Sequence, residues 1–149
     1  MIRVMIDKDL CIGCLNCTLA CMCTHNSKGN SIYDLNLEDI SNESRNHIEL
    51  DSNNHPSPIL CRHCTEPECV LTCMSGAMTK DPKTGIVNYD EKKCVSCFMC
   101  VMSCPYGVLK PDEVNKKIVI KCDMCAEQTT PSCVKNCPTE AIYIMEVDE

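Results

Sequence analysis

Four cysteines in the middle of the chain have a spacing that can hold iron. Cys94, Cys97, Cys100 and Cys104 are separated by two, two and three residues, and Pro105 follows directly. This spacing is typical of bacterial 4Fe-4S sites, in which three thiolates bind one cluster and the fourth binds a neighbouring cluster. Three ligands this close together require a loop that wraps around the cluster. The pattern therefore predicts one-electron redox chemistry.

The same pattern recurs along the chain in four groups of four cysteines. Every group begins with a two-residue gap and ends with a three-residue gap, and only the middle gap varies. The groups are Cys11, Cys14, Cys17 and Cys21; Cys61, Cys64, Cys69 and Cys73; Cys94, Cys97, Cys100 and Cys104; and Cys122, Cys125, Cys133 and Cys137. The repeat predicts four 4Fe-4S clusters with sixteen cysteine ligands. Cys23 fits no ligand position and is interpreted as a buried free thiol.

The composition fits a chain held together by metal clusters. Of the 149 residues, 17 are cysteine, whereas aromatic residues make up 3% and tryptophan is absent, so the ordinary apolar core is thin. Structural zinc usually takes two separated cysteine pairs, but each group here has two further cysteines close behind its first pair. Disulfides are disfavoured in a reducing cytosol. Iron-sulfur clusters explain the pattern better than zinc or disulfides.

Charge and hydropathy exclude several classes of protein. The formal net charge is −7 before any cofactor is counted, and proteins that bind nucleic acid need a positive surface. No apolar run reaches the roughly 18 residues of a membrane span, and the charged start of the chain does not read as a signal peptide. We expect a cytoplasmic protein with no membrane span and no nucleic-acid partner.

Short β-rich runs are expected to position the cysteine loops. Residues 1–6 and 141–147 read as terminal strands that pair with each other. Residues 77–90 read as a hairpin with its turn at 81–85. Residues 106–110 and 117–120 read as a second strand pair.

The pairing of the groups follows from their connections. Loops of this kind exchange their fourth ligands in pairs, and only a short hairpin joins the second group to the third, so the first must pair with the fourth. The predicted ligand sets are set A (Cys11, Cys14, Cys17, Cys137), set B (Cys122, Cys125, Cys133, Cys21), set C (Cys94, Cys97, Cys100, Cys73) and set D (Cys61, Cys64, Cys69, Cys104).

The expected fold class is α+β, with two nested ferredoxin-like (dicluster) halves of short strands and helices around the four clusters. Residues 61–110 would form the inner half, and residues 1–23 with 111–149 the outer half. Residues 24–60 form a polar insert with one strand at His47–Leu50. The insert is either a solvated connector or a docking surface.

Over nearly the whole chain, this pattern resembles the four-cluster, ferredoxin-like electron-transfer subunits of anaerobic redox complexes. The resemblance rests on Cys11–Cys21, on Cys61-Arg62-His63-Cys64 with Cys69 and Cys73, on Cys94–Pro105 and on Cys122–Pro138. It implies the nested pairing of the ligand sets. It also implies a redox enzyme as partner and a downstream oxidoreductase as acceptor. The compact size favours the ferredoxin-like partner of nickel carbon monoxide dehydrogenase, ahead of a hydrogenase or formate dehydrogenase subunit.

The residues outside the cysteine groups predict a conductor of electrons and not an enzyme. No catalytic base, nucleophile or dinucleotide fingerprint is visible, and a cluster with four cysteine ligands has no open position for substrate. An iron-sulfur redox sensor is the alternative from another class, but a sensor needs one cluster and the chain has no DNA-binding motif.

Charged side chains near the loops are interpreted as facing solvent. They include three histidines of the insert, two residues of the second loop and the residue before the last group. These residues are His25, His47, His55, Arg62, His63 and Lys121. In the alternative interpretation, the charge of Arg62 or Lys121 stabilises a reduced cluster and raises its reduction potential.

Overall fold

The computed structural model describes residues 1–114 and 119–147, and its helices and strands are all short. The strands are β1 (Ile2–Ile6), β2 (His47–Leu50), β3 (Pro56–Ile59), β4 (Met78–Lys80), β5 (Val87–Tyr89), β6 (Lys110–Pro111), β7 (Val119–Ile120) and β8 (Ile142–Glu146). The helices are α1 (Asn16–His25), α2 (Glu68–Leu71), α3 (Met99–Ser103) and α4 (Ser132–Lys135), with 3-10 turns η1 (Ile32–Asp34) and η2 (Glu91–Lys93). None of the helices in the described part of the chain combines the length and apolar character needed to cross a bilayer.

The strands pair antiparallel in twos. β1 pairs with β8, with Ile6 opposite Ile142, which confirms the expected pairing of the terminal runs. β4 pairs with β5 across the turn that follows Lys80, so the predicted hairpin is confirmed. β6 pairs with β7, but the prediction of a strand at residues 106–110 is wrong except at Lys110, where β6 begins and from which it continues to Pro111. Residues 117 and 118 of the other predicted strand lie outside the described residues.

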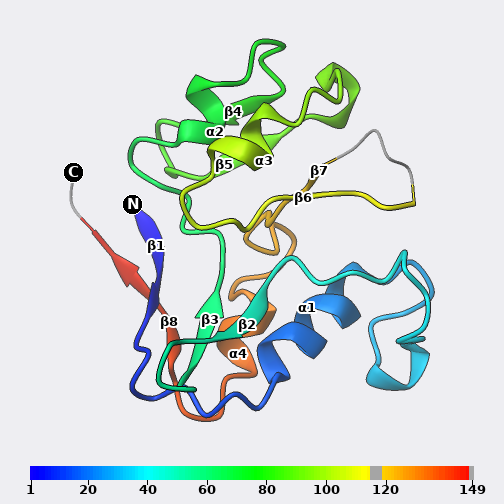
Figure 1. Cartoon of the computed structure of the whole chain (residues 1–149), viewed down its shortest axis with the longest axis vertical. Coiled ribbons are helices and arrows are strands. Elements are labelled where there is room, and N and C mark those ends of the chain that lie inside the picture. The colour runs from blue at the N-terminus through cyan, green and yellow to red at the C-terminus, as the bar shows by residue number, and fades with distance from the viewer. Residues whose placement is uncertain (115–118, 148–149) are drawn as a thin grey trace.

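Two helix pairs accompany two of these sheets. α1 packs against α4 near the β1–β8 sheet, and α2 packs against α3 near the β4–β5 hairpin. Figure 1 shows the second group above the first, with the chain crossing between them after β3 and again after β7. The small mixed fold agrees with the predicted α+β class.

The polar insert contains a hairpin where a single strand was expected. β2 occupies the predicted residues, and β3 pairs with it so that Pro58 lies opposite Ile48. Proline cannot donate a ladder hydrogen bond, which is tolerated in a two-stranded sheet because each strand has a free edge. Pro58 is among the most deeply buried side chains of the described residues, and Leu60 after it reaches the core. The end of the insert is therefore part of the packed structure.

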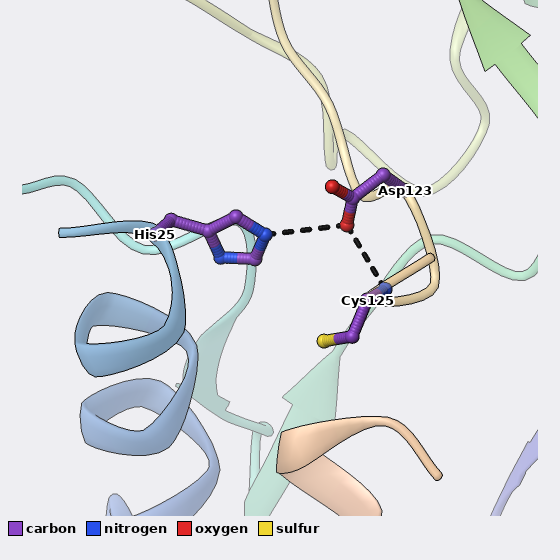
Figure 2. A group of neighbouring side chains, drawn as sticks. All are labelled: His25, Asp123 and Cys125. Carbon is purple, nitrogen blue, oxygen red and sulfur yellow. Dashed lines mark hydrogen bonds and ion pairs between the residues drawn. The ribbon is translucent and has the colours of Figure 1, made fainter. Parts of the chain in front are cut away.

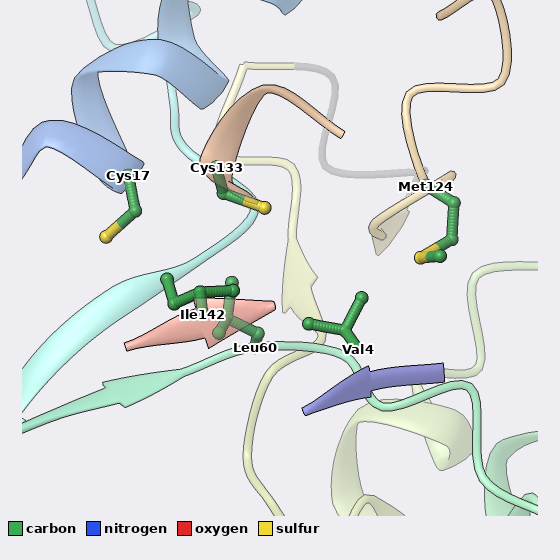
Figure 3. Packing of buried hydrophobic residues seen from close by; sticks show 6 residues of the cluster. All are labelled: Val4, Cys17, Leu60, Met124, Cys133 and Ile142. Atoms are coloured by element: carbon green, nitrogen blue, oxygen red, sulfur yellow. The ribbon is translucent and has the colours of Figure 1, made fainter. Parts of the chain in front are cut away.

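Cysteine makes up much of the two clusters of buried side chains. In the first, Cys17 and Cys133 pack with Val4, Leu60, Met124 and Ile142 (Figure 3). In the second, Cys69 and Cys100 pack with Met78, Val87, Leu109 and Val119. Thiols therefore stand where an ordinary domain of this size has larger apolar side chains, as the composition predicts.

We expect the buried side chains on one face of the β1–β8 sheet to contribute most to its stability. Ile142 is 2% exposed and Met145 of the same strand is 39% exposed. Ile142→Ala should lower the free energy of unfolding by about 2–5 kcal/mol, because it removes buried methyl groups and leaves a cavity. Met145→Ala, the control, should cost less than about 1 kcal/mol. Guanidinium unfolding of the anaerobic protein, followed by circular dichroism, measures both, and equal losses would contradict this packing.

Candidate metal centres

All four cysteine loops share one backbone feature. The residue just before the second cysteine has a positive φ in each loop, with φ of 69° at Gly13, 46° at His63, 60° at Ser96 and 59° at Met124. Only Gly adopts this left-handed conformation without cost, so three non-glycine residues here indicate a turn that the loop requires. The turn bends the chain back on itself between the first and second cysteines.

The loops also share features after their second and fourth cysteines. Leu15 and Phe98 are left-handed N-caps of α1 and α3, which carry the chain toward the fourth cysteines of their groups. Three residues after the fourth cysteine, Gly76, Gly107 and Glu140 are again left-handed, and each donates its N–H to the carbonyl of that cysteine. The first group departs from this rule, because α1 continues past Cys21 to His25.

The four thiols of set A meet around one cavity. Cys11, Cys14 and Cys17 of the first loop line it together with Cys137 from the end of the fourth group. The space here that is free of protein atoms, counted with its part open to solvent, is about 300 Å³. Thr139 and several apolar residues, Ile142 among them, form the rest of the wall.

The thiols of set C surround a second cavity of the same size. Cys94, Cys97 and Cys100 line it with Cys73 from the preceding group, and about 300 Å³ is again free of atoms. Phe98 forms part of its wall.

Set B lines a third cavity, of about 420 Å³. Its wall contains Cys21, Cys122, Cys125 and Cys133, and Cys61 of set D reaches the same wall. The thiols of the fourth predicted set, set D, lie close enough together to affect the pKa of Cys69. Burial raises the pKa of Cys69 to about 11, and the neighbouring Cys61, Cys104 and Cys64 add to that increase against the opposing charge of Lys121.

The sets adjoin one another in a definite order. Cys17 of set A and Cys133 of set B lie in the same buried cluster (Figure 3). Cys61 of set D lies close enough to Cys122 of set B to raise the pKa of its thiol, after the larger effect of burial. Set D and set C meet in the second buried cluster, where Cys69 packs close to Cys100.

Backbone N–H groups point at the sulfurs, as a thiolate ligand requires. Met78 N lies 3.4 Å from Cys73 Sγ, and Met124 N lies 3.4 Å from Cys122 Sγ. Burial alone would raise the pKa of Cys73, but backbone donors, that of Met78 first, bring it below its ordinary value. Inward thiols, inward N–H groups and an apolar wall fit a 4Fe-4S cluster, which needs thiolates and is tuned by such hydrogen bonds.

Two residues that we interpreted as solvent-facing are buried. His63 is 2% exposed, and its Nδ1 accepts a hydrogen bond from Val87 N at 3.0 Å. Burial, helped by the charges of Lys121 and Arg3, lowers the pKa of His63 to about 3, so its ring is neutral. Lys121 is 6% exposed. The interpretation was wrong for both because the second and fourth loops pack against each other. Arg62 lies instead over the Tyr106 ring, 4.7 Å from its centroid.

His25 is also not free in solvent. Its Nε2 lies 3.2 Å from the Asp123 carboxylate (Figure 2). Its Nδ1 lies 2.8 Å from the Cys21 carbonyl and 3.6 Å from Cys21 Sγ. Burial opposes charging of the ring, but Asp123 and Cys21 outweigh it and raise the pKa of His25 to about 10. Arg45 NH1 binds the other oxygen of Asp123 at 2.7 Å. No local pattern could reveal this network, because Asp123 is 98 residues from His25.

His25, Asp123 and Cys125 offer metal-binding atoms that lie within 4.8 Å of one another (Figure 2). Two cations already balance Asp123, and Cys125 faces the set B cavity. The group is therefore better described as an ion-pair network beside set B than as a separate metal site. Cys23 lies outside all four sets and lines a polar groove between α1 and α4.

The spacing and geometry of these loops are typical of proteins that hold iron-sulfur clusters with cysteine thiolates. The 4Fe-4S dicluster domain family matches residues 54–147, which is more than half of the sequence, and the chain belongs to this family. The first cysteine group lies outside the matched residues. The family match confirms the prediction that this is an iron-sulfur protein with 4Fe-4S clusters.

Two similar proteins come from Escherichia coli. The hydrogenase-2 operon protein HybA of strain O157:H7 is 31% identical and matches 93% of this chain and 50% of its own. Formate hydrogenlyase subunit 2 of strain K12 is 28% identical and matches 96% of this chain and 81% of its own. The chain thus spans about half the length of HybA and most of the hydrogenlyase subunit.

A solved structure shares the fold. It is the active site complex BamBC of benzoyl coenzyme A reductase with 1,5-dienoyl-CoA, which matches with a TM-score of 0.55 at 25% sequence identity. The match covers 100% of this chain and 79% of the other. The arrangement of short elements around the loops is therefore one that a known redox complex contains.

The left-handed turn at Ser96 gives a test of the loop geometry. Ser96→Val should destabilise the loop by about 1–2 kcal/mol, because a β-branched side chain is strained at a φ of 60°, whereas Ser96→Gly should be tolerated. Val95→Ser next to it is the control. The rate at which visible absorbance is lost in anaerobic guanidinium compares the variants, and equal rates for all three would contradict the turn.

Proposed function

We propose that the chain is an electron conductor that carries four 4Fe-4S clusters, one in each of sets A, B, C and D. The observation that carries this proposal is the gathering of the predicted thiols from distant parts of the sequence, with three of the sets lining cavities of similar volume. Each bound cluster would accept and release one electron. The residues of the chain supply thiolates, direct N–H groups at the sulfurs and keep water away.

The order in which the sets adjoin supports one route for the electrons. Set A adjoins set B, set B adjoins set D, and set D adjoins set C. We propose that electrons cross between the outer and inner halves at the contact of set B with set D.

The exposure of the cysteines supports sets A and C as the two ends of the route. Cys14 of set A and Cys97 of set C are exposed, whereas Cys21, Cys125 and Cys133 of set B are buried. Apolar residues beside each exposed cysteine are also open to solvent, with Ile12 65% and Val95 66% exposed. Such apolar surfaces are typical of places where a partner docks.

We propose as partners a catalytic redox subunit at one end and an acceptor oxidoreductase at the other. A hydrogenase or formate-oxidising subunit is supported by the similarity to HybA and to formate hydrogenlyase subunit 2. The resemblance in the cysteine pattern suggests a more specific hypothesis, in which the partner is a nickel carbon monoxide dehydrogenase. Anaerobic copurification decides between them, because the metal of the associated large subunit identifies its class.

Iron and electron counts test the number of clusters. The anaerobic protein should contain about sixteen iron atoms and take up about four electrons in a reductive titration, one for each cluster. Two clusters or fewer would contradict the conductor and favour the redox-sensor hypothesis.

Serine variants test which cysteines share a cluster. Cys137→Ser and Cys14→Ser should alter the same signal in electron paramagnetic resonance, because both thiols face the set A cavity. Cys125→Ser should alter a different signal, from set B. Cys23→Ser is the control and should leave all four signals unchanged. A Cys137→Ser protein that loses the signal altered by Cys125→Ser would contradict the proposed sets.

A further inference from the structure

A buried lysine lies where the second and fourth cysteine loops meet. Lys121 directly precedes Cys122 and is 6% exposed. Its Nζ donates hydrogen bonds to the carbonyl oxygens of Val87 at 2.6 Å and of Cys122 at 2.8 Å. Both acceptors are neutral, so they solvate the ammonium group without balancing its charge.

No carboxylate of residues 1–114 and 119–147 forms an ion pair with Lys121. A buried charge without a counter-charge costs several kcal/mol, so its retention inside a protein calls for negative charge nearby. Asp123, the nearest acidic residue in the sequence, is held by His25 and Arg45.

Lys121 contacts residues that belong with two different ligand sets. On the set B side, its Nζ donates to the carbonyl of Cys122. On the set D side, its other acceptor, Val87, lies in the same buried cluster as Cys69, and Val87 N donates to His63, the residue before Cys64. Lys121 therefore lies within electrostatic reach of both sets at the place where they adjoin.

The other basic side chains near Lys121 do not take its place as the cation between the two ligand sets. His63 is neutral, and its Nδ1 is occupied by Val87 N. Arg3 is a second buried cation, and its guanidinium donates to the His63 carbonyl and to Thr65 Oγ1, on the side of the second loop. The contact between the two loops is thus a positively charged strip between thiol sets.

We propose that Lys121 is a shared counter-ion for the clusters of sets B and D, and that it raises the reduction potential of both. This proposal rests on the proposed function. A positive charge stabilises the more negative, reduced form of a nearby cluster, and it acts strongly where protein excludes water. Lys121 acts on the clusters through its charge and not as a ligand. It makes the contact between the two halves a favourable place for an electron.

The test measures the potentials of all four clusters in the anaerobic protein by titration followed with electron paramagnetic resonance, with signals assigned by the serine variants. Lys121→Gln removes the charge and keeps a hydrogen-bond donor, whereas Lys121→Met removes both. Lys93→Met is the matched control, because Lys93 directly precedes Cys94 in the same way but its side chain is 61% exposed.

We expect both Lys121 variants to lower the reduction equilibrium constant of the set B and set D clusters at least about tenfold, which is about 59 mV for a one-electron couple. Sets A and C should change less than about threefold. Lys93→Met should change set C by less than about threefold, because water screens its charge. A shift confined to Lys121→Met would overturn the proposal, since hydrogen bonding would then explain it. An even shift over all four clusters would also overturn it.

Wild-type protein provides a second measurement should the neutral variants not retain four clusters. With ¹⁵N-labelled lysine, pulsed electron paramagnetic resonance of the reduced protein should show nitrogen coupling that disappears in Lys121→Arg. Identical spectra for the two proteins would overturn the proposal. A wild-type protein with fewer than four clusters would instead contradict the proposed function, so the two failures are distinguishable.

Discussion

The structure depends on one constraint, which is that sulfur atoms from distant parts of the sequence must face the same small cavities. Each loop has a left-handed residue before its second cysteine, and in the third and fourth loops the N–H of that residue, Ser96 or Met124, faces the sulfur of the first cysteine. The strands and helices are short because their task is to join these loops. In each buried cluster, two of the six buried side chains are thiols and the other four are apolar side chains that pack against them.

Local patterns predict the parts of this fold that are local in sequence. The spacing of cysteines predicts the loops, and alternating apolar residues with a proline-glycine turn predict the β4–β5 hairpin. The β1–β8 pair is non-local, yet it could be predicted because the nested cysteine groups bring the two ends of the sequence together. The same reasoning gave the ligand sets, which stay a prediction; Cys137 lines one cavity with the first loop, and Cys73 lines another with the third loop.

Residues outside the loops could not be placed in this way. β3 contains two prolines that argue against a strand, and only the buried position of Pro58 against β2 explains it. Burial of His63 and Lys121 follows from contact between two loops that lie about sixty residues apart, which neither motif encodes. Charged side chains are almost never fully buried unless they are paired, so the sequence alone favoured a solvated position for both residues.

The nesting of the cysteine groups has a consequence for biosynthesis. Sets C and D contain no residue beyond Cys104, so both can be complete while the ribosome is still translating the fourth group. Set B must wait for Cys133 and set A for Cys137, and until then the three set A thiols of the first loop lack their fourth partner. The inner half would therefore be able to bind its clusters before the outer half. The thiols of the first loop are synthesised first and would be exposed to oxygen for the longest time.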